Sequence, residues 1–191
     1  MLDISLQDQP ETLMCYFGVG DTYTPAHKDL CASIGHNLMS TCIPSSTSGH
    51  PFTRPSLAYS ENDGSAFWFM SSTSDADAAS TWFHGMNEEL DLETHLATVD
   101  EWAQAPFKVY ICQQRLGDFL LVPKRSCHQV REFHFVDKPS SRTHSRFPQV
   151  INHGGLNIKT SWSRMSIESL ELSLEIELLI YRRYVIQLPD R

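Results

Sequence analysis

The segment TYTPAHKDL, residues 22–30, contains two side chains of the kind that bind metal ions, and their spacing bears on the whole fold. His27 and Asp29 are separated by one residue. On a β-strand, residues i and i+2 project from the same face, so the imidazole and the carboxylate can converge on one ion. A third ligand must then come from another strand. The segment therefore predicts a β-sheet protein in which strands distant in sequence meet at a site.

His128, in the segment VPKRSCHQV at 122–130, supplies the third ligand in this interpretation. It follows a Gly-Asp turn and an apolar run, as a strand of a barrel does. Two histidines and one carboxylate leave coordination positions open, which suits non-haem Fe(II). By itself a His-x-Asp pair is more often a surface histidine beside a solvated aspartate, and the chain has 9 histidines from which such a pair can arise.

Short strand-like runs separated by turns occur over most of the chain. They lie at 14–19, 66–70, 106–114, 118–123, around His128 and at 156–163. Between the second and third runs, apolar residues recur at helical spacing through 74–105, which predicts a pair of helices that ends before Pro106. We expect a mainly β fold, an antiparallel barrel or jelly roll with an inserted helical pair.

The region after residue 166 fits two structures. Alternating leucines at 170–178 are typical of a strand, whereas Ile167, Leu170, Leu174 and Leu178 also lie on one face of a helix. Ser166 can cap such a helix, and glutamates suit its N-terminal half. A C-terminal helix is the favoured prediction.

Two segments are predicted to lie outside the regular elements. Residues 43–65 are rich in Ser, Pro and Gly and are expected to form an exposed loop. Residues 131–151 are polar and lack periodicity, so they form an atypical insertion directly after the strand of His128. This insertion is either a surface loop or the translation of an unspliced intron.

The composition limits the classes of protein to which the chain can belong. Its 191 residues fit a single domain, 1–191, and its net charge of -8 argues against broad electrostatic capture of nucleic acid. Its 5 scattered cysteines without a CxxC pair argue against a disulfide framework or a zinc knuckle, and predict buried, reduced thiols in an intracellular protein. No signal sequence and no apolar run of roughly 18 residues is present, so no membrane association is expected.

Five motifs together resemble one family along most of the chain, from about residue 16 to 184. They are TYTPAHKD, SIGHNLM, AFWFM, QRLGDFLLVPKRSCHQV and NIKTSWSR, in this order. Their residues and sequence are similar to those of the JmjC domain family, and most of all to fungal JmjC domain-containing proteins. The resemblance implies a double-stranded β-helix of the cupin or jelly-roll type. It also implies an N-terminally truncated domain, because JmjC domains usually have further strands before TxxHxD.

The resemblance assigns roles to individual residues. It implies that His27, Asp29 and His128 bind Fe(II), and that the Thr24 hydroxyl and the Asn37 amide contact 2-oxoglutarate. For Asn37 the alternative is a strand amide bonded to a neighbouring strand.

One departure from the family pattern concerns the cosubstrate. The family's usual lysine is absent around 66–68, so Lys159 on the last strand is the candidate partner of the cosubstrate carboxylate; the alternative is a solvated lysine. Trp68, Trp162 and Tyr110 either line the pocket or belong to the ordinary core.

Two functions follow from the resemblance. The first is an Fe(II)- and 2-oxoglutarate-dependent dioxygenase, an oxidoreductase of the nucleus that acts as a histone lysine demethylase or a protein hydroxylase on a protein or histone-tail substrate. The second is a catalytically silent JmjC module that serves as an interaction or scaffold domain. A cupin that binds a metal without 2-oxoglutarate is a more distant third. Direct binding of nucleic acid is not expected.

Overall fold

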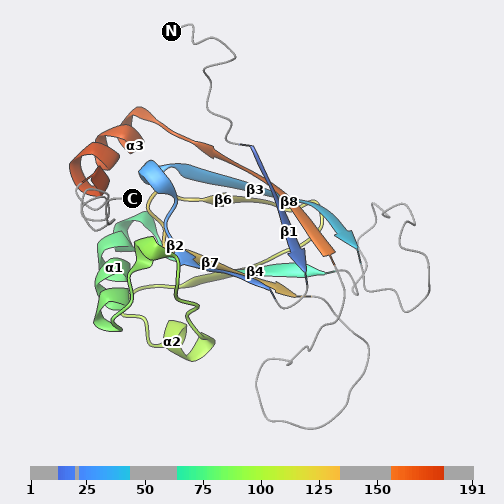
Figure 1. The fold of residues 1–191 in the computed structure, drawn as a ribbon, viewed down its shortest axis with the longest axis horizontal. Coiled ribbons are helices and arrows are strands. Elements are labelled where there is room, and N and C mark those ends of the chain that lie inside the picture. Colours follow the sequence, from blue (N-terminus) through green and yellow to red (C-terminus); the bar gives the residue numbers. More distant parts are fainter. Residues whose placement is uncertain (1–12, 20–21, 44–63, 134–155, 179–191) are drawn as a thin grey trace, which may run out of the picture.

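The computed structural model describes residues 13–19, 22–43, 64–133 and 156–178, and these residues form two four-stranded antiparallel sheets (Figure 1). The order in the first sheet is β1 (Met14–Val19), β8 (Leu156–Arg164), β3 (Ile34–Ile43) and β6 (Phe119–Val122). The order in the second sheet is β2 (Tyr23–His27), β7 (His128–Phe133), β4 (Ser65–Met70) and β5 (Tyr110–Gln114). The prediction of a mainly β fold is confirmed.

The first sheet has one buried face, because residues alternate along β3 and β8. The buried residues in these strands are Gly35, Asn37, Met39, Cys42, Asn157 and Lys159. Between residues 34 and 40, and between 156 and 160, buried and more exposed residues alternate. This period of two is the one that a pleated strand imposes on its side chains. The buried face is therefore polar as well as apolar, which marks it as the wall of a site.

The second sheet is buried on both faces. Ala66, Trp68 and Val130 pack in one apolar cluster with Met39 of the first sheet. Ala26, Phe69 and Cys127 belong to a second cluster, together with residues of the helical segment that follows β4. Consecutive residues of β2 and β7 therefore point in turn into the space between the sheets and into the helical layer.

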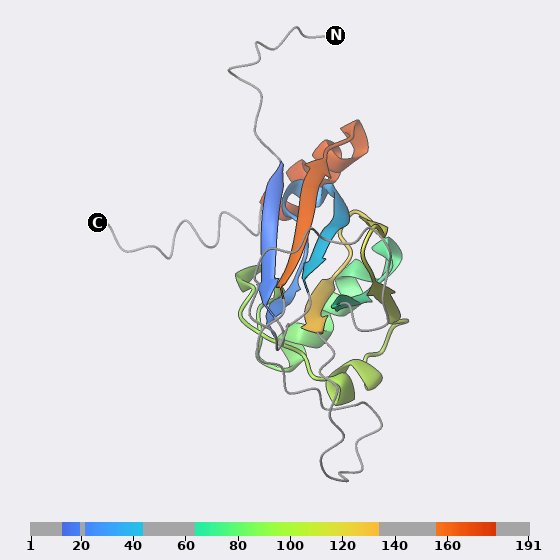
Figure 2. The same ribbon diagram turned by 90° about the vertical axis from the view of Figure 1, so that its right-hand side faces the viewer.

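The helical layer consists of α1 (Ala76–Gly85) and α2 (Val99–Ala103), with the 3₁₀ turns η2 (Thr73–Asp75) and η3 (Leu90–Leu92) (Figures 1 and 2). Phe83 of α1 and Trp102 of α2 are 0% and 3% exposed. The helical insertion between strands is thus present, but the second helix is shorter than the apolar spacing predicted. Thr98 caps it in a reciprocal box with Glu101, so the preceding residues cannot belong to it.

The C-terminal helix is present as favoured, as α3 (Ile167–Leu172) continued by the π-helical turn η4 (Ser173–Glu177). Its Ser166 cap accepts a hydrogen bond from the Ser169 backbone N–H. The helix packs against η1 (Leu30–Ala32) through its small residues, since Ser169 is 0% exposed while Ile167 is 77% exposed.

Most of the two predicted segments, 43–65 and 131–151, lies outside the described residues, as does 152–155. The predicted ends were wrong where strands extend into them: Ile43 belongs to β3, Ser65 to β4 and residues 131–133 to β7. Residues 1–12 and 179–191 are likewise not described. Within the described part of the chain, none of the helices combines the length and hydrophobicity needed to span a membrane.

All the cysteines are free thiols. Cys42 and Cys127 are buried as predicted, whereas Cys15 is exposed. The prediction of burial was wrong for Cys15 because it lies on β1, the edge strand of the first sheet, where the outward face is open.

Candidate metal centre

The antiparallel pairing of β2 and β7 brings the two histidines together. His27 is the last residue of β2 and stands directly opposite His128, the first residue of β7. Their ring centroids are 4.2 Å apart. The strand register therefore places two imidazoles on the same side of the second sheet, although the residues lie far apart in the chain.

Asp29 completes the group from beyond the end of β2. The sequence placed Asp29 on the same strand as His27, but the strand ends at His27 and Asp29 begins the turn of η1. Its backbone remains extended, with φ -59° and ψ 138°, so the alternation of side chains continues for two more residues. Asp29 Oδ1 lies 3.8 Å from His128 Nε2, and one ligand atom from each of the three residues lies within 4.8 Å of the others.

Backbone carbonyls fix the orientation of both imidazoles. His27 Nδ1 lies 2.8 Å from the carbonyl oxygen of Pro25, and His128 Nδ1 lies 3.1 Å from that of Ser126. A carbonyl oxygen only accepts, so each Nδ1 must carry the proton and donate it. In the neutral ring, Nε2 then carries no proton, and its lone pair can bind a metal ion. Metal-binding histidines use this arrangement.

Burial shifts the pKa values of two of the ligands, His128 and Asp29. It lowers the pKa of His128 to about 3, with a smaller contribution from His27, so this imidazole is neutral near pH 7. Burial also raises the pKa of Asp29, and the neighbouring His27 partly opposes that rise. A divalent cation among these atoms would compensate the Asp29 carboxylate for the loss of water around it.

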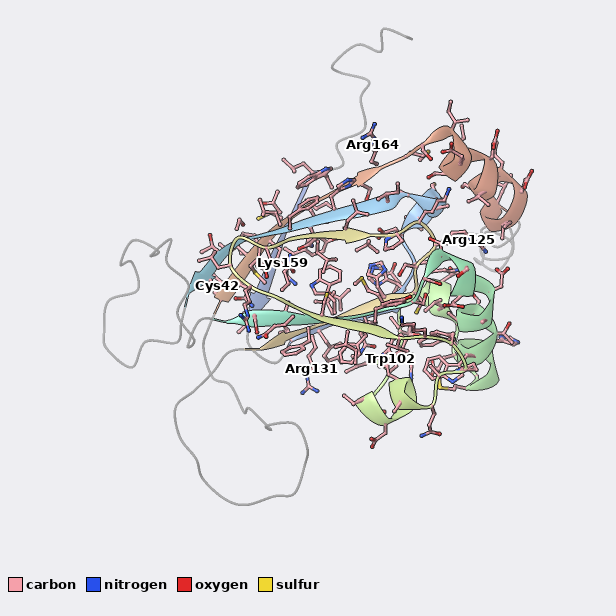
Figure 3. All side chains as sticks on the ribbon, turned by 180° about the vertical axis from the view of Figure 1, so that it is seen from behind. Cys42, Trp102, Arg125, Arg131, Lys159 and Arg164 are labelled. Carbon is pink, nitrogen blue, oxygen red and sulfur yellow. The ribbon has the colours of Figure 1, made fainter. Side chains whose placement is uncertain are left out.

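All the residues predicted for metal or cosubstrate binding line one cavity of about 220 Å³ between the sheets. They are His27, Asp29 and His128, together with Thr24, Asn37 and Lys159. Lys159 is only 4% exposed, and it points into the space between the sheets in Figure 3, whereas Arg131 and Arg164 point away from it. Its Nζ lies 5.5 Å from the centre of the Trp68 ring, so a cation faces the cavity from the first sheet.

An amide network holds Asn37 in place. Gln114 Nε2 donates to Asn37 Oδ1 over 3.0 Å, and Gln114 Oε1 accepts from Trp68 Nε1 over 2.8 Å. Gln114 is 1% exposed, and it links β3 of one sheet to β4 and β5 of the other. Asn37 is therefore bonded to a residue of the other sheet, as the alternative interpretation held, and it also lines the cavity, where its contact with a cosubstrate stays a prediction.

Among the predicted pocket aromatics, Trp68 lines the cavity but Trp162 and Tyr110 do not. Trp162 stacks on His36 with ring centroids 5.3 Å apart, on the outer face of the first sheet. Tyr110 is 44% exposed, with Lys108 Nζ 4.5 Å from its ring centre. Trp162 stands at a position of β8 whose parity is opposite to that of Lys159. Tyr110 shares the parity of Gln114, but it lies at the far end of the edge strand β5, opposite Met70.

Two residues of the site were missed at the level of sequence. Tyr16 of β1 lines the cavity and is paired with Lys159 of β8; burial, followed by the charges of Asp29 and Glu93, raises its pKa. Gly35 of β3 lies so close to Asp29 that a Cβ atom there would stand 2.5 Å from Asp29 Oδ2. The strand register would have revealed Tyr16, whereas only the three-dimensional fold reveals the role of Gly35.

Comparison with known proteins gives one informative similarity. No protein-family model matches the chain. Over 166 residues, or 86% of its length, the chain is 31% identical to C-module-binding factor A of Dictyostelium discoideum. It spans 13% of the length of that relative. The chain is thus similar, over most of its own length, to a short part of a much longer protein that is named as a binding factor.

Proposed function

We propose that this chain is a JmjC-type domain that binds Fe(II) through His27, Asp29 and His128 and acts as a 2-oxoglutarate-dependent dioxygenase. The observation that carries the proposal is the convergence of this triad, with a buried lysine, on one cavity. The strand order supports the corresponding fold. The chain changes sheet at every step except between β4 and β5, as expected for a jelly roll of eight strands.

The donor set fits Fe(II). Two imidazole nitrogens and one carboxylate oxygen on one side of an ion leave the remaining positions open for small ligands. When bound there with 2-oxoglutarate and O₂, Fe(II) would supply the oxidising chemistry that hydroxylates a C–H bond. The protein's own part is to orient the two imidazoles through Pro25 and Ser126, and to hold the triad together at one cavity between the sheets.

The cosubstrate is assigned to the polar wall of the same cavity. A carboxylate between the sheets needs a cationic or hydrogen-bonding partner, because an unpaired buried charge costs several kcal/mol. The Lys159 ammonium group provides the charge, and the Thr24 hydroxyl and Asn37 amide provide polar contacts in this proposal. By the family resemblance, the substrate is a protein side chain in the nucleus, such as a methyl-lysine of a histone tail or a residue that becomes hydroxylated.

A second candidate function is a catalytically silent module that serves as an interaction domain. The name of the similar Dictyostelium protein, a binding factor, favours this candidate at least as well as the first. The absence of a lysine from β4, where many JmjC domains carry one, points the same way. Under this proposal the triad retains a structural metal and the surface of the domain binds a protein partner.

Succinate release separates the two candidates. The purified chain is incubated with Fe(II) and 2-oxoglutarate in air, beside His27→Ala and the control His84→Ala, whose side chain is 78% exposed on α1. Succinate from the wild type and His84→Ala, but not from His27→Ala, supports the dioxygenase. Stoichiometric iron without succinate supports the silent module, and the absence of iron binding contradicts the proposed metal centre.

A further inference from the structure

A buried ion pair lies behind the metal triad, on the face of the second sheet that is turned away from the cavity. Lys28 stands between His27 and Asp29 and is 8% exposed. Its Nζ lies 3.2 Å from Asp91 Oδ1 and 3.4 Å from Ser80 Oγ. Asp91 belongs to η3 and Ser80 to α1, so the pair ties the ligand segment directly to the helical layer.

The Lys28–Asp91 pair is largely buried, so the attraction between its two charges is strong. The side chains of Lys28 and Asp91 are 5% and 21% exposed, and attraction between opposite charges is much stronger in such surroundings than in water. The pair is therefore a strong link between the residue that precedes Asp29 and η3.

Asp29 lies between the end of β2 and η1, which packs against α3. The two residues after Leu30 take left-handed backbone angles, with φ 57° at Cys31 and 46° at Ala32. Residues other than glycine keep such angles only where their surroundings force them to. On the cavity side, the missing side chain of Gly35 leaves room for the Asp29 carboxylate. A Cβ atom at Gly35 would stand 2.5 Å from Asp29 Oδ2.

We propose that Lys28 and Asp91 are a positioning pair that sets the Asp29 carboxylate as the third metal ligand. The inference rests on the proposed metal centre and adds to it a role for residues that contact no metal. Fixing Lys28 to the helical layer fixes the direction of its neighbour, because successive side chains of an extended segment point to opposite faces. Loss of a partner that orients a ligand typically lowers metal affinity by about 10- to 100-fold.

Cobalt titration of the full chain tests this role. Co(II) is added to chelator-treated protein, and both the affinity and the visible absorption spectrum are recorded. Lys28→Met and Asp91→Asn are expected to weaken Co(II) binding by about 10- to 100-fold and to alter the spectrum, because the carboxylate no longer reaches the ion. The control is Asp77→Asn, which removes the 2.7 Å ion pair with Arg125 at the exposed side of α1 and is expected to change neither.

A double variant separates positioning from stability. Lys28→Met combined with Asp91→Leu leaves no unpaired buried charge, so it is expected to regain the thermal stability that single variants lose, but not the Co(II) affinity. Recovery of both together would show that the pair acts on stability alone and would overturn the inference. Unchanged affinity and spectrum in a folded Lys28→Met variant would do the same. Failure of the wild type to bind Co(II) would instead contradict the proposed metal centre.

Discussion

The two imidazoles of the triad differ in burial. His128 is 3% exposed and neutral near pH 7, because burial lowers its pKa to about 3. His27 is only half-buried and lies at the wall of the cavity. A metal that binds near neutral pH therefore displaces no proton from His128.

The pKa of His128 predicts how stability depends on pH. The pKa of His128 is about 3 in the folded protein, below the ordinary value of 6.5. Between these two pH values the unfolded chain binds a proton at His128, and the folded chain does not. Acidification from pH 6.5 should therefore destabilise the metal-free protein, by up to about 1.4 kcal/mol for each pH unit. Urea unfolding of the metal-free proteins at pH 7 and pH 5 measures this effect. Between these two pH values the free energy of unfolding should fall more in the wild type than in His128→Gln.

The comparison of these two proteins isolates His128. Burial raises the pKa of Asp29, so in the acid range its proton uptake favours the folded state and acts in the opposite direction. Asp29 is present in both proteins, so most of its effect cancels in the difference. Equal acid sensitivity of the wild type and His128→Gln would show that His128 is not held neutral by burial.

Gly35 should be needed for metal binding, because a side chain there would meet Asp29 first and Val122 of β6 next. A methyl group there would collide with the Asp29 carboxylate, which must then turn away from the two imidazoles. Gly35→Ala is expected to lower Mn(II) affinity by about 10-fold or more, the range found when a ligand is misdirected. The matched control is Gly85→Ala at the end of α1, where an added Cβ has no neighbour within 4 Å. Equal Mn(II) affinity of the two variants would contradict this role.

Lys159 should matter for the cosubstrate and not for the metal. Lys159→Met keeps the length of the side chain but removes its charge from the cavity wall, so a carboxylate there loses its cationic partner. We expect N-oxalylglycine, a mimic of 2-oxoglutarate, to bind at least about 10-fold more weakly by calorimetry in the presence of Mn(II). Arg164→Met, on the exposed end of the same strand, is the control. Unchanged affinity in Lys159→Met would remove Lys159 from the cosubstrate site.

At the scale of elements, local patterns predicted the strands better than the helices. Alternation identifies a strand with one buried face, and β1, β4 and β8 fall where the sequence placed them. The second helix of the insertion was predicted too long, because the leucines before Thr98 have helical spacing but the capping box starts the helix only after it. Apolar spacing predicts which residues share a face of a helix, but it does not predict the residue at which the helix begins.

The C-terminal helix shows a further limit of local patterns. Its apolar stripe identified a helix correctly, but the side that meets the protein is the one with Ser169 and Ser173, at 0% and 9% exposed. Leu170 and Leu174 remain 49% and 58% exposed. The close approach of the helix to η1 selects small residues, and that approach is a property of the tertiary fold.

This inverted arrangement predicts an unusual order of mutational effects. Ser169→Leu should destabilise the protein by about 1–3 kcal/mol, because the added atoms have no space against the body of the domain. Leu174→Ser, which removes an apolar side chain, should change stability by no more than about 0.5 kcal/mol, since that side chain is already largely in water. The midpoints of urea unfolding measure both changes. The reverse order would show that the leucine face is the buried one.

At the scale of the whole molecule, the site joins parts of the chain that local patterns cannot connect. The spacing of His27 and Asp29 suggested a shared face, but the choice of His128 among 9 histidines came from the order of family motifs. The register that sets His27 opposite His128 is long-range, and no local periodicity specifies it. The same holds for Gly35, whose lack of a side chain matters only because the Asp29 turn passes in front of β3.

Because its ligands meet only in the folded chain, a metal should stabilise the molecule as a whole. An ion that binds the folded state alone, at 100 times its dissociation constant, contributes about 2.7 kcal/mol. For a domain of this size that corresponds to a rise in Tm of roughly 5–10 °C. Thermal unfolding of chelator-treated protein with and without Fe(II) under nitrogen measures the rise, and excess chelator should reverse it. Asp29→Ala should abolish the rise, whereas the exposed-site variant His84→Ala should keep it. An equal rise in Asp29→Ala would mean that the ion stabilises the fold from somewhere other than the triad.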